Sequence, residues 1–117
     1  MTLHSGLAAG RWLELSLMEQ LAHIGSEVGR ACRAKDGGNQ DRFDASFDRA
    51  LELFDLTLAD PRWRLPRLRE IARDREMTVD LLVGNNAFGW SSASIDRYFT
   101  SFAVAARTAR NGSLEPG

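Results

Sequence analysis

One long helical pattern, between Arg11 and Arg33, constrains the fold of this chain more than any other segment. Apolar residues recur along it at alternating spacings of four and three, as on the buried face of an α-helix. Beside this seam runs a second stripe at the same spacings, made mostly of small residues that let another backbone come close. The seam consists of Leu17, Leu21, Ile24, Val28 and Ala31, and the stripe of Met18, Ala22, Gly25, Gly29 and Cys32. The pattern predicts a helix with close neighbours on two sides.

Three further segments carry helical patterns, and none alternates as a strand would. The predicted helices cover residues 9–35, 41–59, 66–83 and 91–109. Paired glycines, an Asp-Pro step and a loop at 84–90 that is rich in turn-forming residues separate them. Short connections make neighbouring helices antiparallel. We therefore expect an all-α fold, an antiparallel up-down four-helix bundle over residues 11–109, with a flexible N-terminus at 1–10 and a disordered tail at 110–117.

Composition excludes several classes of protein. The chain has 117 residues, which suits one domain, and a net charge of −1, which gives no general attraction to nucleic acid or membrane. Cys32 is the single cysteine, so no internal disulfide can form. No apolar run has the length of a membrane span, and residues 1–10 lack the features of a signal peptide. We expect a cytoplasmic protein without a membrane partner.

Several small or apolar residues lie where a single four-helix chain would leave them uncovered. Gly25 and Gly29 weaken a helix, so their presence favours close packing over a kink. In the third predicted helix, Met77 and Leu81 lie almost opposite the main apolar face. The packing partner is either another helix of the chain or a second copy of it. The predicted interface of a homo-oligomer comprises Met18, Ala22, Gly25, Gly29, Met77 and Leu81.

Arg75 falls in the middle of the apolar face of the third predicted helix. A buried guanidinium keeps its charge and needs a carboxylate or several carbonyl acceptors. We predict a buried ion pair with Glu27, which borders the apolar face of the first helix. The alternative is an arginine that binds an anion inside a cavity. Other carboxylates that could serve are Glu14, Asp55, Glu76 and Asp96.

The chain shows no arrangement typical of catalysis or of cofactor binding. Glu19, His23 and Glu27 follow one another at four-residue spacing, but this pattern fits a solvated face with weak pairing better than a metal site. No glycine-rich phosphate loop occurs, and no histidine lies near the serines at 91–94. We expect a protein that is not an enzyme and that holds no metal or cofactor.

Two segments offer groups that suit recognition of a partner. The connection before the third helix contains Arg62, Trp63, Arg64 and Arg67, which could contact the phosphates and an unpaired base of RNA. The loop at 84–90 contains two asparagines and two aromatic residues, which form a partner-binding loop or fold back to close the end of the bundle. The loop residues are Asn85, Asn86, Phe88 and Trp90.

Four quoted segments carry a resemblance to a family of small, uncharacterised bacterial helical proteins. They are GRWLELSLMEQLAHIGSEVGRA, FDRALELFDLTLADPRWR, GNNAFG and YFTSFAVAAR, and the resemblance covers about residues 10–108. In length and helix number the chain is also similar to the four-helix products of ribosomal-RNA intervening sequences and to the bundle accessory proteins of diversity-generating retroelements. These resemblances imply a homo-oligomeric bundle and, for some members, binding of RNA or of a reverse transcriptase.

The sequence therefore favours a non-catalytic, cytoplasmic adaptor or scaffold that acts as an oligomer with a protein partner. The alternative is an RNA-binding or nucleoprotein accessory bundle that uses the arginine-rich connection. Both functions need a surface rather than an enclosed catalytic site.

Overall fold

The structure is a computed structural model that describes the backbone of residues 10–114 and the side chains of residues 10–109. A short helical turn at residues 10–12 precedes four long helices, and none of the described residues forms a strand. None of the described helices combines the length and the apolar character needed to cross a bilayer. The long helices are α2 (Leu17–Asp36), α3 (Gln40–Leu58), α4 (Arg67–Val83) and α5 (Ser92–Leu114).

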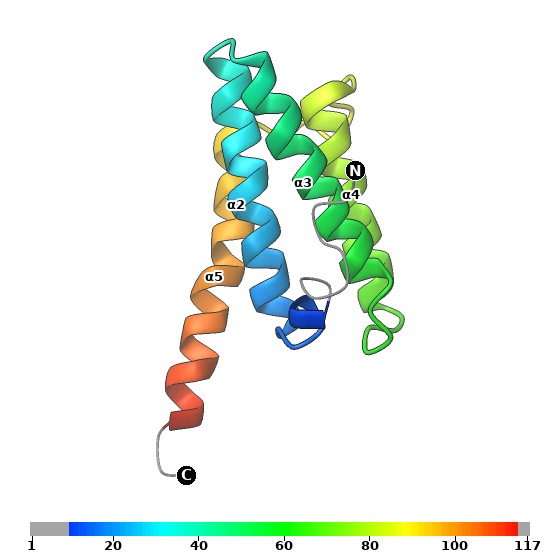
Figure 1. The fold of residues 1–117 in the computed structure, drawn as a ribbon, viewed down its shortest axis with the longest axis vertical. Coiled ribbons are helices and arrows are strands. Elements are labelled where there is room, and N and C mark those ends of the chain that lie inside the picture. Colours follow the sequence, from blue (N-terminus) through cyan, green and yellow to red (C-terminus); the bar gives the residue numbers. More distant parts are fainter. Residues whose placement is uncertain (1–9, 115–117) are drawn as a thin grey trace.

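Helix α2 is the centre of the arrangement. It packs most extensively against α3 and α5, while α4 packs on α3 and makes a smaller contact with α2. The chain reverses direction at each connection, and the last turns of α5 extend beyond the other helices (Figure 1). The predicted all-α class is confirmed, but the prediction of four helices omits the separate turn at residues 10–12.

The first predicted helix, at residues 9–35, is wrong at residues 13–16, which are not helical. The chain leaves the helical conformation after residue 12, and α2 begins only at Leu17. Ser16 caps α2 by accepting a hydrogen bond from the backbone N–H of Glu19, whose carboxylate accepts one in turn from the N–H of Ser16. This capping box provides acceptors for two backbone N–H groups at the start of α2. In a continuous helix these groups would bond to carbonyl oxygens of the preceding turn. The break lets Trp12 turn back onto the core, where it is 7% exposed.

The other helix boundaries follow the expected signals, with one exception. Asn39 caps α3 by accepting a hydrogen bond from the N–H of Arg42, and Pro66 immediately precedes α4. Helix α5 begins at Ser92 as expected but continues to Leu114, beyond the predicted end at residue 109. Residues 1–9 and 115–117, the rest of the predicted flexible ends, lie outside the described part of the chain.

The small-residue stripe of α2 is covered by α5 of the same chain. A Cβ atom placed on Gly25 would lie only 2.4 Å from Cβ of Phe99, so the two helices touch where glycine leaves room. Phe99 continues into the core against Phe54, with ring centroids 6.3 Å apart. Of the two alternatives for the stripe, another helix of the chain is therefore its partner at Gly25.

The other residues assigned to an intermolecular interface also pack within the chain. Met77 is 8% exposed, and Leu81 and Met18 lie partly buried against the core. The expectation that a single chain leaves these positions uncovered is therefore wrong. The buried face of α4 is rotated relative to the predicted one, since Asp74 is buried and Val83 is 55% exposed.

Candidate functional site

The predicted ion pair between Arg75 and Glu27 does not form. Arg75 instead donates from Nε to Oδ1 of Asp55 at 3.1 Å, and both side chains are partly exposed at the α3–α4 contact. Glu27 pairs with Arg30 and Arg49, the latter at 2.5 Å from Nε to Oε2. The sequence predicted Arg75 in the middle of the apolar face of this helix, whereas in the structure the neighbouring Asp74 is 3% exposed and the Arg75 side chain is 35% exposed.

Two of the four residues predicted to contact RNA belong to a buried polar network at the base of the fold. Arg62 donates to both carboxylate oxygens of Asp60, whose side chain is fully buried, and to the carbonyl oxygen of Leu15 at 2.6 Å. These bonds from Arg62 hold the pKa of Asp60 below its ordinary value. Trp63 donates from Nε1 to Oε1 of Gln20 at 2.8 Å, and the guanidinium of Arg62 lies 4.5 Å from the centre of its ring.

Gln20 joins this network to the N-terminal turn. Its side-chain amide donates to the carbonyl of Trp12 at 2.9 Å and to Oδ2 of Asp60 at 3.1 Å. Trp12 donates in turn to Oγ1 of Thr57 at 3.0 Å. Every polar group of the buried Gln20 side chain is therefore satisfied. Arg62 and Trp63 therefore hold this junction together, and their contact with RNA stays a prediction.

Arg64 and Arg67 remain exposed, and the described residues offer neither of them an ion pair within 4 Å. In the loop at 84–90, Asn86 adopts a positive φ of 52° and exchanges two hydrogen bonds with the backbone of Trp90. The ring of Trp90 packs edge-on against Tyr98 while Phe88 is 45% exposed. The loop therefore turns one aromatic inward and leaves the other, with Asn85, at the surface.

Four arginines from α2 and α3 line a groove that the sequence did not reveal. The hollow has a volume of about 700 Å³ and lies between the C-terminal half of α2 and the N-terminal half of α3. Its remaining walls are small or polar, including Ser46 and Asn39, and no carboxylate is among the residues that line it. We call this the arginine groove, and its arginines are Arg30, Arg33, Arg42 and Arg49.

The charge of the arginine groove is only partly compensated. Arg30 and Arg49 share the single carboxylate of Glu27, which is 8% exposed, while their own side chains remain 58% and 40% exposed. Within the described part of the chain, Arg33 and Arg42 form no ion pair. Asp96 of α5 lies beyond Arg33 in a smaller neighbouring hollow. Glu27 therefore orients two guanidinium groups and leaves a surplus of positive charge facing solvent.

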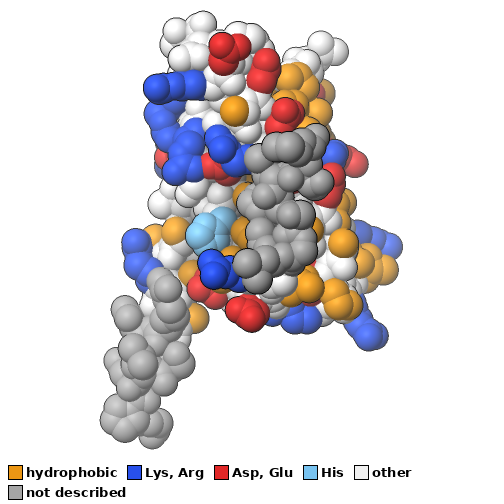
Figure 2. Space-filling view, viewed as in Figure 1, with side chains coloured by type: hydrophobic (Ala, Val, Ile, Leu, Met, Phe, Trp, Pro, Cys, Tyr) orange, Lys and Arg blue, Asp and Glu red, His pale blue; other side chains and the backbone are white. Residues whose placement is uncertain are grey.

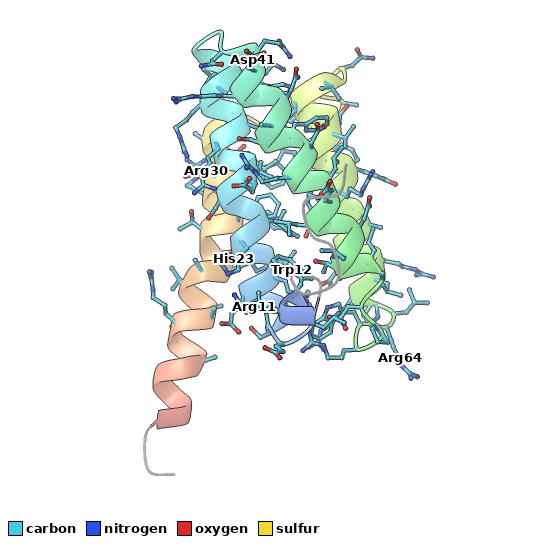
Figure 3. The ribbon with its side chains drawn as sticks, viewed as in Figure 1. Arg11, Trp12, His23, Arg30, Asp41 and Arg64 are labelled. Carbon is cyan, nitrogen blue, oxygen red and sulfur yellow. The ribbon has the colours of Figure 1, made fainter. Side chains whose placement is uncertain are left out.

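A second hollow adjoins the arginine groove along α2. It shares Arg30 and Arg49 with the arginine groove, adds Arg11 and the exposed His23, and is also lined by the carboxylate of Glu27. Figure 3 labels Arg30 and His23 along α2 and Arg11 on the N-terminal turn below them, and Lys and Arg side chains gather at the upper left of the face shown in Figure 2. Arg64 lies at the opposite lower corner of the molecule (Figure 3). The arginine groove is thus separate from the connection that the sequence favoured.

A signal for this groove exists in the sequence but needs the helix pairing to be recognised. Arg30 and Arg33 are three residues apart, and Arg42 and Arg49 are seven apart, so each pair shares one helix face. Asp44 and Asp48 lie between Arg42 and Arg49 in the sequence, so this segment does not stand out as basic. Only the antiparallel pairing of α2 with α3 places the two arginine pairs opposite each other.

The groups considered for metal and thiol chemistry form no reactive centre in the part of the chain that is described. No cluster of three or more His, Cys, Asp or Glu side chains occurs there that could hold a metal ion. Glu19 serves the capping box of α2, and Glu27 serves two arginines. Cys32 is buried, and burial raises the pKa of its thiol.

Comparison of the chain with protein-family models, with curated proteins and with solved structures finds no match. The resemblance to small bacterial helical proteins accordingly stays a prediction.

Proposed function

We propose that this chain is a non-catalytic RNA-binding protein whose arginine groove holds the phosphate backbone of single-stranded RNA. The observation that supports this proposal is the convergence of four arginines on one hollow without a lining carboxylate. Arginine presents a planar fork of donors that matches phosphate oxygens in a bidentate manner. This function corresponds to the RNA-binding alternative from the sequence, with the binding surface moved from the connection to the seam between α2 and α3.

The form of the surface favours a single strand over a duplex. A hollow between two helices can receive one phosphodiester chain, whereas recognition in the major groove of DNA requires an element that enters that groove. The polar side chains of Asn39 and Ser46 line the same hollow and could accept or donate hydrogen bonds to ribose hydroxyls. His23, exposed beside Arg30, offers an imidazole face for a base.

The double variant Arg33→Gln/Arg42→Gln is expected to weaken binding of a fluorescent 12-nucleotide single-stranded RNA at least tenfold. Both arginines are exposed and unpaired within the described residues, so their removal should leave the fold intact. The slope of log affinity against log salt should fall by about 1.4, since each lost phosphate contact on a single strand contributes about 0.7. Fluorescence anisotropy over a salt series measures both quantities.

The matched control is Arg64→Gln/Arg67→Gln, which removes the same charge from the other side of the molecule. We expect this control to bind within twofold of the parent chain. Equal losses in both variants would mean that overall charge alone drives binding, and absence of salt-sensitive RNA binding in the parent chain would refute the proposal. Weaker RNA binding in the control alone would mean that the binding site lies at the connection before α4.

A homo-oligomeric adaptor is the second candidate, and the projecting end of α5 supports it. The last turns of this helix extend past the body of the fold (Figure 1), and Val104, nearer the middle of α5, is 48% exposed. An exposed apolar side chain on a helix favours contact with a second copy. Light scattering should then give a multiple of the 13.0 kDa chain mass, and a mass of one chain at micromolar concentration would exclude it.

We also propose that the four long helices are best classed as an antiparallel up-down bundle and that the protein is cytoplasmic. The alternating helix directions in Figure 1 support the first assignment. A single buried cysteine, which needs no oxidising compartment, supports the second.

A further inference from the structure

A second site is built where α2, α4 and α5 meet, away from the arginine groove. There a hollow of about 540 Å³ opens, within the size range of small-molecule pockets. Helix α2 contributes only apolar side chains to this hollow, and α5 contributes Tyr98 and the aromatic ring of Phe102. The apolar walls are formed mainly by Leu17, Met18, Leu21, Ile71 and Phe102.

Asp74 gives this hollow a buried acceptor that the chain does not fully use. Its side chain lines the hollow although the residue is only 3% exposed. Oδ1 accepts a hydrogen bond from the hydroxyl of Tyr98 at 2.6 Å, while Oδ2 has no partner among the described residues. A buried carboxylate oxygen without a donor is costly, so a donor supplied by a ligand would be strongly favoured there.

The charges around Asp74 determine which ligand fits. Glu70 and Arg73 on α4 act on the Asp74 carboxyl in opposite senses, and Tyr98 is the polar group that reaches it from α5. Arg62 and Arg64 of the α3–α4 connection and Arg67 at the start of α4 also line the hollow. Arg67 and Asp74 are seven residues apart on one helix, about 10 Å along its axis. An anionic group at the Asp74 end would meet two carboxylates, whereas a cationic group there would be stabilised.

We propose that this hollow binds a small organic amine, whose ammonium group donates to Oδ2 of Asp74 and whose apolar body packs against Met18, Leu21 and Phe102. A neutral apolar compound would fill the same space but leave Oδ2 without a donor. Burial raises the pKa of Asp74 to about 6, so the carboxyl is ionised at pH 7.5 and can pair with the ammonium. This proposal does not depend on the RNA-binding function, because the two sites share no residue.

The test compares 4-phenylbutylamine with 4-phenylbutan-1-ol, which have the same apolar body and differ in the charged group. Isothermal titration calorimetry at pH 7.5 is expected to show at least tenfold tighter binding of the amine to the parent chain. Asp74→Asn retains an oxygen that can accept from Tyr98, and it should reduce amine affinity at least tenfold. Glu76→Gln removes the same charge from an exposed position of α4 and should change nothing.

Tyr98→Phe separates a binding role of Asp74 from a purely structural one. It leaves both oxygens of Asp74 without a donor from the chain, so the preference for the amine should persist or increase. Equal affinity of the parent chain for the amine and the alcohol would overturn the proposal. So would an unchanged amine preference in Asp74→Asn, or loss of that preference in Tyr98→Phe when circular dichroism shows an intact fold.

Discussion

Gly25→Ala is expected to lower the free energy of unfolding by about 3 kcal/mol, because a single methyl group would occupy the contact between α2 and α5. The added Cβ would lie 2.4 Å from Cβ and 2.9 Å from Cγ of Phe99. These atoms are next to the backbone of α5, so no simple side-chain rotation relieves the overlap. Since Phe99 also packs against Phe54, displacement of α5 would disturb the centre of the core. Urea unfolding followed by circular dichroism measures the change.

Gly29→Ala provides a control at the next position of the same stripe. A Cβ there would meet the end of the Arg33 side chain, 3.3 Å from Nη1, and that flexible group can move. Replacing glycine by alanine within a helix contributes about 1 kcal/mol of stability, so this variant should be neutral or more stable. Equal effects of the two substitutions would show that close approach of α5 does not explain Gly25.

Asp60→Ala is expected to destabilise the fold by about 3 kcal/mol, because it removes the shared acceptor of the network at its base. The side chain of Asp60 is fully buried, and its carboxylate accepts hydrogen bonds from Arg62 and Gln20. Without it, the amide of Gln20 loses a partner in the interior, and the junction between the N-terminal turn and the α3–α4 connection weakens. Chemical denaturation at pH 7 measures this loss.

Asp55→Ala is the matched control, since it also removes an aspartate paired with an arginine. Both partners of the Asp55–Arg75 pair are substantially exposed, and such pairs contribute little. We expect a change within about 0.5 kcal/mol. A loss as large as that of Asp60→Ala would mean that burial does not distinguish the two pairs.

The contribution of Asp60 to the free energy of unfolding should also depend on pH in a defined direction. The pKa of this carboxyl is held below its ordinary value of 3.8 in the folded chain, so the unfolded chain takes up the proton first. The stabilisation is therefore fully present above pH 3.8 and is lost as the pH falls through the lowered folded value. The difference in stability between the parent chain and Asp60→Ala should narrow on acidification, and a constant difference would contradict this assignment.

The arginine groove and the amine site differ in how far the sequence could indicate them. The spacing of the two arginines on each helix places them on a common face, so each side of the groove can be inferred from its own helix. The hollow at Asp74 has no such local signal, since a lone aspartate among charged residues of α4 is expected to face solvent. Its burial depends on Tyr98, which donates to it from α5, twenty-four residues further along the chain.

The sequence by itself determined the helical class, the bounds of α3 and α4 to within one residue, and the presence of a small-residue stripe that demands a close neighbour. These are consequences of hydrophobic periodicity, turn residues and glycine, all of which act within a few residues. Even the break before α2 was available as the Ser16 and Glu19 capping signal.

Only the tertiary structure decided which residues pair. Glu27 meets Arg30 and Arg49 instead of Arg75, Arg62 meets Asp60, and Asp74 meets Tyr98. Charged side chains have several possible partners of similar energy, and the rotation of each helix about its axis, which the packing of the whole core sets, selects among them. A helical wheel places a side chain on a face, but the neighbouring helix decides whether that face holds an ion pair, a groove or a buried acceptor.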